Sequence, residues 1–373
     1  MVFPRTRTLL IHLPVERTKS GVLERNCTLV SSRKLLNQTL KYLNQGPTMS
    51  TSNENKLEVV GYDEAQKVFT VKSLATGHTL LVQDTFAEMF PLWVGRILIT
   101  AENEKWAQIA ANVTTGFATS VIMAPAEAAI ESYVTPDQTP DKRPGALVQI
   151  YNRDRFALKH QLMERIGQCI MTCPTTAAFN GLQGKRVLRV GNSLRYFGDG
   201  FQKKTMVADR RCWKIPVMEG NFIVQDGFGA MEGVAGGNFM IFAENQAAGL
   251  RAAEAAADAI RARAPDVIMP FPGGVCRAGS KAGSLKYKMK ASTNHPYCPS
   301  LRTIVPDSVV PENVSSVYEI VMNGLTLDAV KNGMKQGLIA AAGVHGVVKI
   351  SSGNYGGKLG PFKAFLKDAI GAA

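Results

Sequence analysis

The sequence lacks several features that would assign it to a class of protein at once. No apolar run approaches the ~20 residues of a membrane helix, which excludes a spanning protein. No phosphate-binding G-x-x-x-x-G-K-[ST] loop, no G-x-S-x-G nucleophile elbow and no H-E-x-x-H pair occurs. The five histidines are isolated from one another, so covalent or metal-assisted catalysis has little support.

Cysteine is also scarce, with six in 373 residues and no secretory signal. Reduced thiols in a cytoplasmic protein are the best interpretation. Cys169 and Cys173 are four residues apart, which is not the spacing of a zinc knuckle. We therefore expect no metal site.

Basic residues outnumber acidic ones, giving a formal charge of +13. Residues 1–48 carry +6 of this charge and leave +7 on the remainder. We expect residues 1–55 to be a disordered extension or a misassigned start, with Met49 opening the folded protein. The basic body could meet nucleic acid or a small polyanion, and charge alone does not decide between them.

Alternating and apolar segments predict an α+β fold with two lobes, at residues 56–190 and 191–373. Strands are expected at 96–101, 117–125 and 236–245, and helices at 102–116, 154–172 and 246–264. The segment "TTGFATSVIMAPAEAAIE" is echoed by "GVAGGNFMIFAENQAAGL". Two related α/β sandwich lobes would explain this echo, as would coincidence between alanine-rich stretches.

Five glycine-rich segments lie beside predicted strands. They are "YFGDGFQ", "GVAGGNF", "PFPGGVCRAGSKAGS", "KASTNHPYCP" and "SSGNYGGKLG". Glycine lets backbone N–H groups approach a ligand and stabilise an oxyanion, although any one segment could equally be a plain turn. Together they predict a ligand cleft.

Glu319 lies within the apolar strand "VYEIVMNG". Burial would raise its pKa toward neutrality and suit it to proton exchange, whereas on an edge strand it would simply face water. Glu127 and Glu244 lie near strand ends, where a glutamate is more often the first residue of a helix.

The run "SKAGSLKYKMK" carries four lysines around Tyr287. A solvated surface is the ordinary interpretation, and a site for carboxylates or phosphate is the functional alternative. Nucleic acid is disfavoured because no recognised binding module surrounds the run.

Many collinear motifs between residues 84 and 366 resemble the formylmethanofuran–tetrahydromethanopterin formyltransferase family. They include "DTFAEMFPLWVGRILITA", "TGFATSVIMAPAEAAIE", "RIGQCIMTCPTTAAF", "VYEIVMNGL" and "VVKISSGNYGGKLG". The resemblance implies two ferredoxin-like α/β sandwich lobes in one chain, a homotetramer and no tightly bound cofactor. Tetrahydromethanopterin and methanofuran would be co-substrates, and bacterial members belong to a formyltransferase/hydrolase complex in the oxidation of formaldehyde to formate.

Glu319 matches the glutamate proposed for the active site of this family, so we expect it to handle the proton. Substrate-binding residues are expected in the glycine-rich and "ASTN" segments: Gly236, Gly237, Gly273, Gly274, Lys281, Ser292, Thr293 and Asn294. The alternative is a non-catalytic pterin-binding or scaffold subunit of the complex. Neither interpretation includes nucleic acid or a membrane as a partner.

Overall fold

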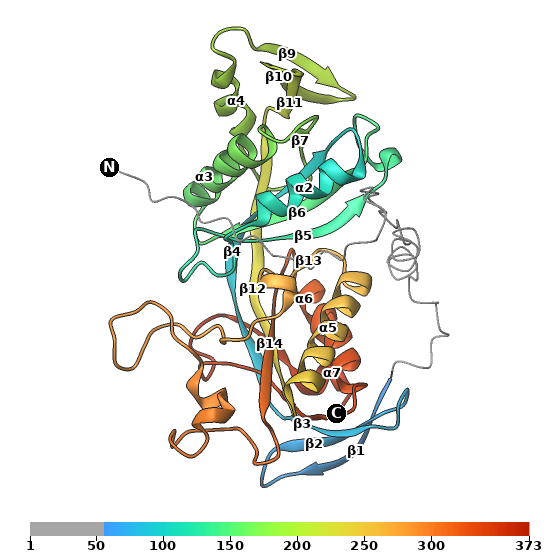
Figure 1. Cartoon of the computed structure of the whole chain (residues 1–373), viewed down its shortest axis with the longest axis vertical. Coiled ribbons are helices and arrows are strands. Elements are labelled where there is room, and N and C mark those ends of the chain that lie inside the picture. Colours follow the sequence, from blue (N-terminus) through green and yellow to red (C-terminus); the bar gives the residue numbers. More distant parts are fainter. Residues whose placement is uncertain (1–55, 373) are drawn as a thin grey trace, which may run out of the picture. The chain divides into compact units, whose positions relative to one another are not determined.

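The computed structural model describes residues 56–372, so the expectation for residues 1–55 lies outside the described part except at its last residue, Lys56. Within the described part, helices and strands alternate in two lobes of the same build (Figure 1). The predicted α+β class with two ferredoxin-like lobes is confirmed by the strand order described next.

The first lobe is a β-α-β-β-α-β unit. Its elements are β4 (Phe86–Thr100), α2 (Glu104–Thr115), β5 (Glu127–Val134), β6 (Gly145–Asn152), α3 (Arg155–Arg165) and β7 (Ala177–Asn180). The strands pair antiparallel in the order β7-β4-β6-β5, which is the ferredoxin-like order. Apolar side chains of the two helices pack on one face of this sheet, including Ala110 and Leu162.

The second lobe repeats the unit. Its elements are β12 (Phe228–Ala243), α5 (Gln246–Arg263), β13 (Val267–Ile268), β14 (Ser316–Gly324), α6 (Leu327–Ala342) and β15 (Val347–Ser351). The order β15-β12-β14-β13 matches that of the first lobe. Small residues on α5 and α6, such as Ala253 and Ala341, let both helices pack closely over the sheet.

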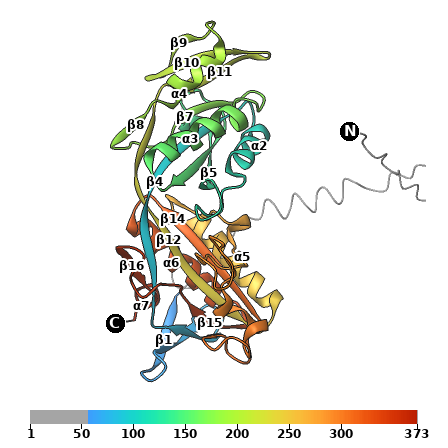
Figure 2. The same cartoon turned by 90° about the vertical axis from the view of Figure 1, so that its left-hand side faces the viewer.

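The two sheets are joined because β4 and β12 are long enough to belong to both (Figure 2). Phe90–Val94 pair antiparallel with Met231–Ala235. A bulge follows at Gly236, whose φ of +91° favours glycine. This crossing forms the floor of the site described below.

Further strands extend each lobe. In the second lobe, β1 (Leu57–Asp63), β2 (Val68–Ser73) and β3 (Thr79–Gln83) continue the sheet through β15, and β16 (Phe362–Phe365) pairs with β4 before α7 (Leu366–Ile370). In the first lobe, the added elements are β8 (Arg186–Leu188), α4 (Val190–Leu194), β9 (Lys203–Val207), β10 (Arg210–Val217) and β11 (Gly220–Gln225). The lobe boundary at 190/191 stays a prediction. The strands β1–β3 belong to the second lobe although they precede β4 in the chain.

The two lobes begin their first helices in the same way. Asn103 caps α2 and Asn245 caps α5, each with φ −148° and ψ 167°, and each side chain accepts a backbone N–H three residues on. The recurring motif is therefore Ala-Glu-Asn at 101–103 and at 243–245. The predicted echo joined the wrong segments.

One predicted strand is wrong. Residues 117–125 form turns, in which Phe117 has φ 47° and Ser120 O accepts the N–H groups of Met123 and Ala124. Pro125 has no N–H to donate to a sheet, and Glu127 accepts the Val121 N–H instead. This turn brings Ser120–Ile122 to the rim of the cleft.

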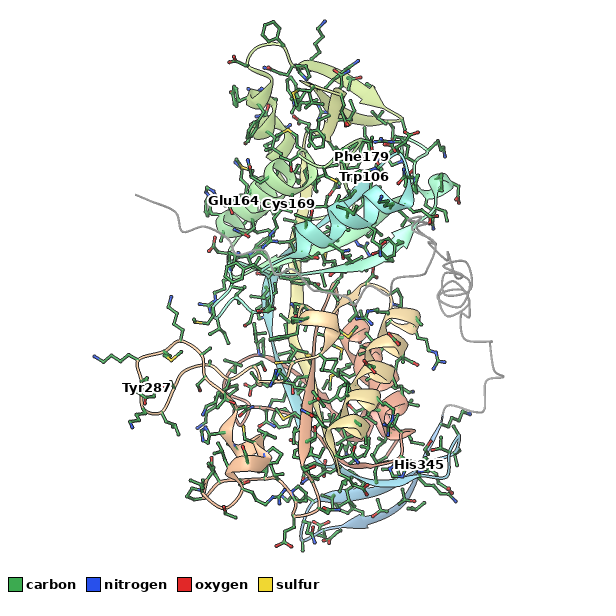
Figure 3. The ribbon with its side chains drawn as sticks, viewed as in Figure 1. Trp106, Glu164, Cys169, Phe179, Tyr287 and His345 are labelled. Atoms are coloured by element: carbon green, nitrogen blue, oxygen red, sulfur yellow. The ribbon has the colours of Figure 1, made fainter. Side chains whose placement is uncertain are left out.

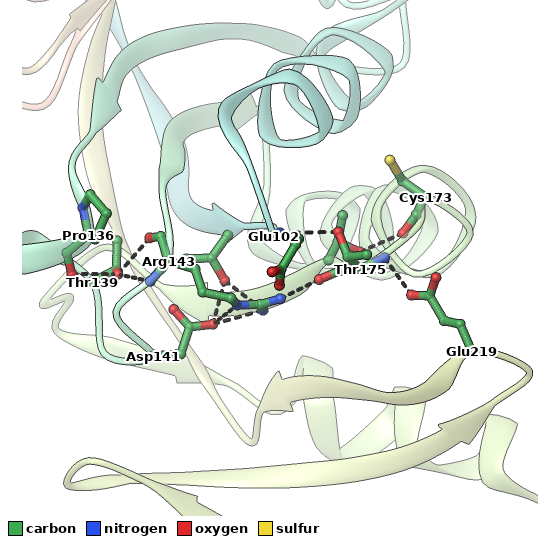
Figure 4. Close-up of polar contacts among 10 residues, drawn as sticks. Glu102, Pro136, Thr139, Asp141, Arg143, Cys173, Thr175 and Glu219 are labelled. Carbon is green, nitrogen blue, oxygen red and sulfur yellow. Dashed lines mark hydrogen bonds and ion pairs between the residues drawn. The ribbon is translucent and has the colours of Figure 1, made fainter.

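A second turn in the first lobe is fixed by side-chain hydrogen bonds (Figure 4). Arg143 donates to Asp141 Oδ2 at 2.9 Å, to Thr100 Oγ1 at 3.1 Å and to the Thr175 carbonyl at 2.5 Å. Thr175 Oγ1 in turn accepts the Glu102 N–H at 3.1 Å. These contacts hold the loops that precede β6 and β7 against the end of β4.

Candidate functional site

A cleft of about 480 Å³ lies over the crossing of β4 and β12. Its walls come from both lobes: the 120–122 turn and Glu127 on one side, and the 280–282 and 353–359 loops on the other. Three of its acidic side chains, Glu88, Glu127 and Glu319, are buried. Each is held differently, and the differences define the chemistry available.

Glu319 lies in the middle of β14, where the strand's alternation decides its direction. Its neighbours Tyr318 and Ile320 pack toward the helices, so Glu319 points to the opposite face and into the cleft. The residue is only 3% exposed. Ser280 donates its N–H to Oε2 at 2.9 Å and its hydroxyl to Oε1 at 2.8 Å.

Burial raises the pKa of Glu319 to about 7, because the hydrogen bonds from Ser280 and Cys276 offset only part of the desolvation. A carboxyl with this pKa gains and loses a proton near neutrality. The strand also fixes its place, since Glu319 and Cys276 exchange backbone hydrogen bonds of 2.8 and 2.9 Å. The site therefore holds a positioned proton donor and acceptor.

Glu127 is the second buried acid of the cleft and was not singled out as a site residue from the sequence. It is the first residue of β5, so the interpretation as the start of a helix is wrong. Asn323 Nδ2 donates to Oε2 at 2.6 Å, and the Val121 N–H donates to Oε1 at 3.0 Å. Burial raises the pKa of Glu127, while these bonds and Arg153 act in the opposite direction.

Glu88 stabilises a loop at the rim. Its carboxylate accepts the N–H groups of Tyr355 at 2.8 Å, Gly357 at 3.1 Å and Gly360 at 2.9 Å, and also that of Leu359. Burial acts to raise the pKa of Glu88, but these bonds outweigh it and the pKa lies below its ordinary value. Glu88 is thus a charged structural group that shapes the cleft.

Glu244 takes no part in the cleft. It is exposed in the turn before α5, whose N-cap is Asn245. No sequence signal separated it from Glu127; the fold does, because only Glu127 faces the crossing of β4 and β12.

Three of the predicted binding residues line the cleft together with Glu319: Gly236, Lys281 and Asn294. Lys281 Nζ donates to His295 Nδ1 at 2.8 Å, since an ammonium has only hydrogens to offer. The Asn294 side-chain amide makes no hydrogen bond within residues 56–372, so it is available to a ligand.

The other predicted residues lie elsewhere. A Cβ at Gly237 would come within 2.3 Å of Val330, so this glycine allows β12 to pack against α6. Gly273 and Gly274 line a separate cavity of about 670 Å³ beside Phe117 and Arg261. Ser292 and Thr293 lie on the loop beside Asn294, and their binding role, like that of the others, stays a prediction.

Two of the cleft's glycine N–H groups already have partners. Gly236 N donates to Asn323 Oδ1 at 3.2 Å, and Gly353 N donates to Asn238 Oδ1 at 2.7 Å. The expected backbone oxyanion donors are therefore not at these glycines. Among the predicted binding residues, Lys281 and Asn294 are the two that bring side-chain donors to the cleft.

The rest of the lysine run extends away from the cleft. Lys286, Lys288 and Lys290 are exposed on a loop that projects outward around Tyr287 (Figure 3). Only Lys281, at the base of this loop, reaches the cleft.

No helix in residues 56–372 is long and apolar enough to cross a membrane. No three histidine, cysteine or acidic side chains in the same range come together as metal ligands would.

Family models match both lobes. Residues 76–217 match the model described as formylmethanofuran-tetrahydromethanopterin formyltransferase, and residues 220–369 match the model described as its proximal lobe. Among individual relatives, the formylmethanofuran–tetrahydromethanopterin formyltransferase of Methanocaldococcus jannaschii is 53% identical over 292 residues, 77% of this chain and 97% of the relative. That of Methanopyrus kandleri is 52% identical over the same shares.

Two solved structures are similar. The formyltransferase from Methanosarcina barkeri is 49% identical with a TM-score of 0.74, and the alignment covers 77% of this chain and 97% of that one. A chain of the formyltransferase/hydrolase complex from Methylorubrum extorquens, solved with methylofuran, is 43% identical with a TM-score of 0.75 and coverages of 79% and 98%. The likeness therefore extends over nearly the full length of these chains.

Proposed function

Because the chain belongs to the formylmethanofuran–tetrahydromethanopterin formyltransferase family, we propose that it moves a formyl group between 5-formyl-tetrahydromethanopterin and the primary amine of methanofuran or its bacterial analogue. The transfer is direct, within a ternary complex. Its place is one-carbon metabolism, on the way from formaldehyde to formate. The observation that carries the proposal is Glu319, buried in the cleft with a pKa of about 7.

The reaction requires one proton to move between two nitrogens. The amine nitrogen attacks the formyl carbon, and a new C–N bond forms as the carbonyl becomes a tetrahedral oxyanion. The amine loses a proton, the old C–N bond breaks, and the pterin nitrogen gains a proton. Glu319 takes the first proton as a carboxylate and returns it as a carboxylic acid, so no net proton is consumed.

The oxyanion needs donors that are already in place. Lys281 and Asn294 line the cleft with Glu319, and Lys281 is oriented by His295. One such preorganised donor contributes roughly 2.7–4 kcal/mol to stabilising the transition state. Holding both substrates in one cleft supplies a further part of the rate, since well-oriented reactions gain about 7–11 kcal/mol.

The proposal includes the setting of the enzyme. It acts in the cytoplasm with the two coenzymes as co-substrates and no tightly bound cofactor. It assembles as a homotetramer. It also binds formyl-hydrolase subunits, because the similar chain from Methylorubrum extorquens belongs to a formyltransferase/hydrolase complex.

The test is turnover of the purified full chain with 5-formyl-tetrahydromethanopterin and a methanofuran, alone and with hydrolase subunits added. We expect formyl-methanofuran to form in proportion to enzyme. If no product forms under either condition while the pterin still binds, the chain is the non-catalytic subunit instead.

A further inference from the structure

A second cavity, of about 520 Å³, is lined by residues of β9, β10 and α4 in the first lobe. Figures 1 and 2 show these three elements together at one end of that lobe. It shares no lining residue with the cleft. Four cationic side chains line it, and one carboxylate: Arg189, Arg195, Lys204, Arg211 and Asp226. None of these residues was singled out from the sequence.

The pairing of β9 with β10 explains why the charges converge. Lys204 lies opposite Trp213, and Met206 lies opposite Arg211, so these four side chains share one face of the hairpin. The neighbouring pair, Thr205 and Cys212, points the other way, and Cys212 enters the apolar core.

The carboxylate does not neutralise the whole cluster. Asp226 accepts the Trp213 Nε1 hydrogen at 2.8 Å through Oδ1, and its Oδ2 is paired with Arg189. Arg195, Lys204 and Arg211 make no ion pair within residues 56–372. Three cations therefore face one cavity without a matching anion.

Two of these cations lie over the ring of Trp213. Arg195 Cζ is 5.2 Å and Lys204 Nζ is 5.8 Å from the ring centroid. Cation–π attraction stabilises each of them there, but it does not remove the repulsion between the like charges. A ligand with several anionic oxygens would remove it, because guanidinium groups bind carboxylate and phosphate in a forked geometry.

We propose that this cavity is a binding site, separate from the cleft, for a small ligand carrying two or more carboxylate or phosphate groups. The site does not depend on the formyl-transfer function.

The test is calorimetric titration of the full chain with inorganic pyrophosphate and, in a parallel arm, with citrate. The two probes distinguish phosphate from carboxylate as the preferred source of negative charge. We expect at least one of them to bind, and binding to weaken as salt rises.

The chain offers a matched control on the same two strands. Lys204→Gln with Arg211→Gln should weaken binding at least tenfold. Lys203→Gln with Lys214→Gln removes the same charge from a directly opposed, exposed pair that does not line the cavity, and should change binding less than twofold. Formyl transfer should be unchanged in both variants.

Equal weakening in the two double variants would show a non-specific basic surface and overturn the proposal. Lack of binding of either probe at millimolar concentration would also overturn it. Circular dichroism of each variant shows whether a loss of binding is a loss of folding.

Discussion

The two lobes have the same backbone plan but carry opposite kinds of side chain at one matching position. Aligning Ala101-Glu102-Asn103 with Ala243-Glu244-Asn245 places Leu98 with Met240. Leu98 pairs with Leu147 on β6, and Met240 pairs with Glu319 on β14. The position that holds the acid in the second lobe therefore holds leucine in the first.

What covers each sheet accounts for the difference. Leu147 packs with Leu98, Phe179 and Cys212, so β10 closes this face with apolar groups. Glu319 is covered by the loop around Ser280, which supplies two hydrogen bonds and leaves a cleft beside it. The same fold therefore forms a cleft in the lobe where polar loops lie over the sheet, and a closed apolar core in the lobe where β10 lies over it.

The largest effect is expected for Glu319→Gln. Because the amide cannot exchange the proton, kcat should fall by about 10²–10⁴-fold, with KM for both substrates little changed. The matched control is Leu147→Gln at the equivalent register, which should keep most of the turnover. Wild-type-like rates in the Glu319 variant would remove this residue from the mechanism.

The second prediction concerns stability against pH. The pKa of Glu319 in the folded chain, about 7, lies above its ordinary value of 4.5. The contribution of Glu319 to the unfolding free energy is therefore fully present below pH 4.5 and is lost as the pH rises through 7. The amide of Glu319→Gln mimics the neutral acid and avoids this loss. The unfolding free energy of the variant minus that of the wild type should therefore rise with pH. This difference should be about 3 kcal/mol larger at pH 8–9 than at pH 5.

Urea unfolding at several pH values measures this difference. A difference between the two proteins that stays constant from pH 5 to 9 would show that Glu319 is not desolvated in the folded chain.

Glu88→Gln should show the opposite pH dependence. The pKa of Glu88 in the folded chain is lowered. Its contribution to the unfolding free energy is therefore present above the ordinary pKa and is lost as the pH falls through the pKa of the folded chain. Since an amide oxygen cannot replace a carboxylate that accepts four N–H groups, we expect a loss of about 2 kcal/mol at pH 7 that shrinks in acid.

Hydrogen exchange locates the Glu88 effect. The amides of Tyr355, Gly357, Leu359 and Gly360 should exchange faster in the variant, while those of α2 stay as in the wild type. Unchanged protection in the loop would contradict the role given to Glu88.

The smallest effect is expected for variants of the two helix N-caps, which compare the same turn in the two lobes. Asn103→Ala and Asn245→Ala each remove a cap of the same geometry, so each should lower the unfolding free energy by about 1 kcal/mol. Chemical denaturation of the two variants should give values within about 0.5 kcal/mol of each other. A larger gap would show that the two strand-to-helix turns are not equivalent.

The patterns of apolar and polar residues in the sequence predicted helices and strands whose formation depends on residues near them in the chain. The helix expected at 246–264 is α5, and the apolar run around Glu319 predicted β14. The run left open whether Glu319 is buried or faces water, and the structure shows that it is buried. The strands β4 and β12 begin ten and eight residues before their expected starts. Pro91, Gly95 and Gly233 weakened the strand signal there, and the pairing of the two strands with each other compensates for it.

The parts of the site that escaped prediction depend on distant partners. Glu88 meets a loop 267–272 residues away, and Glu127 meets Asn323 196 residues away. A single sequence shows neither contact, so it could not tell Glu127 from Glu244. Likewise, it could not show that the N–H groups of Gly236 and Gly353 are occupied by asparagine side chains.

The shared strands under the cleft have a consequence for how substrates arrive. Five residue pairs between β4 and β12 connect the lobes as one continuous ribbon, and Glu127 is tied across it to Asn323. A hinge at this place would have to break main-chain hydrogen bonds, so the reaction chamber stands ready before either coenzyme enters. Catalysis then takes place on a framework that does not bend between the lobes.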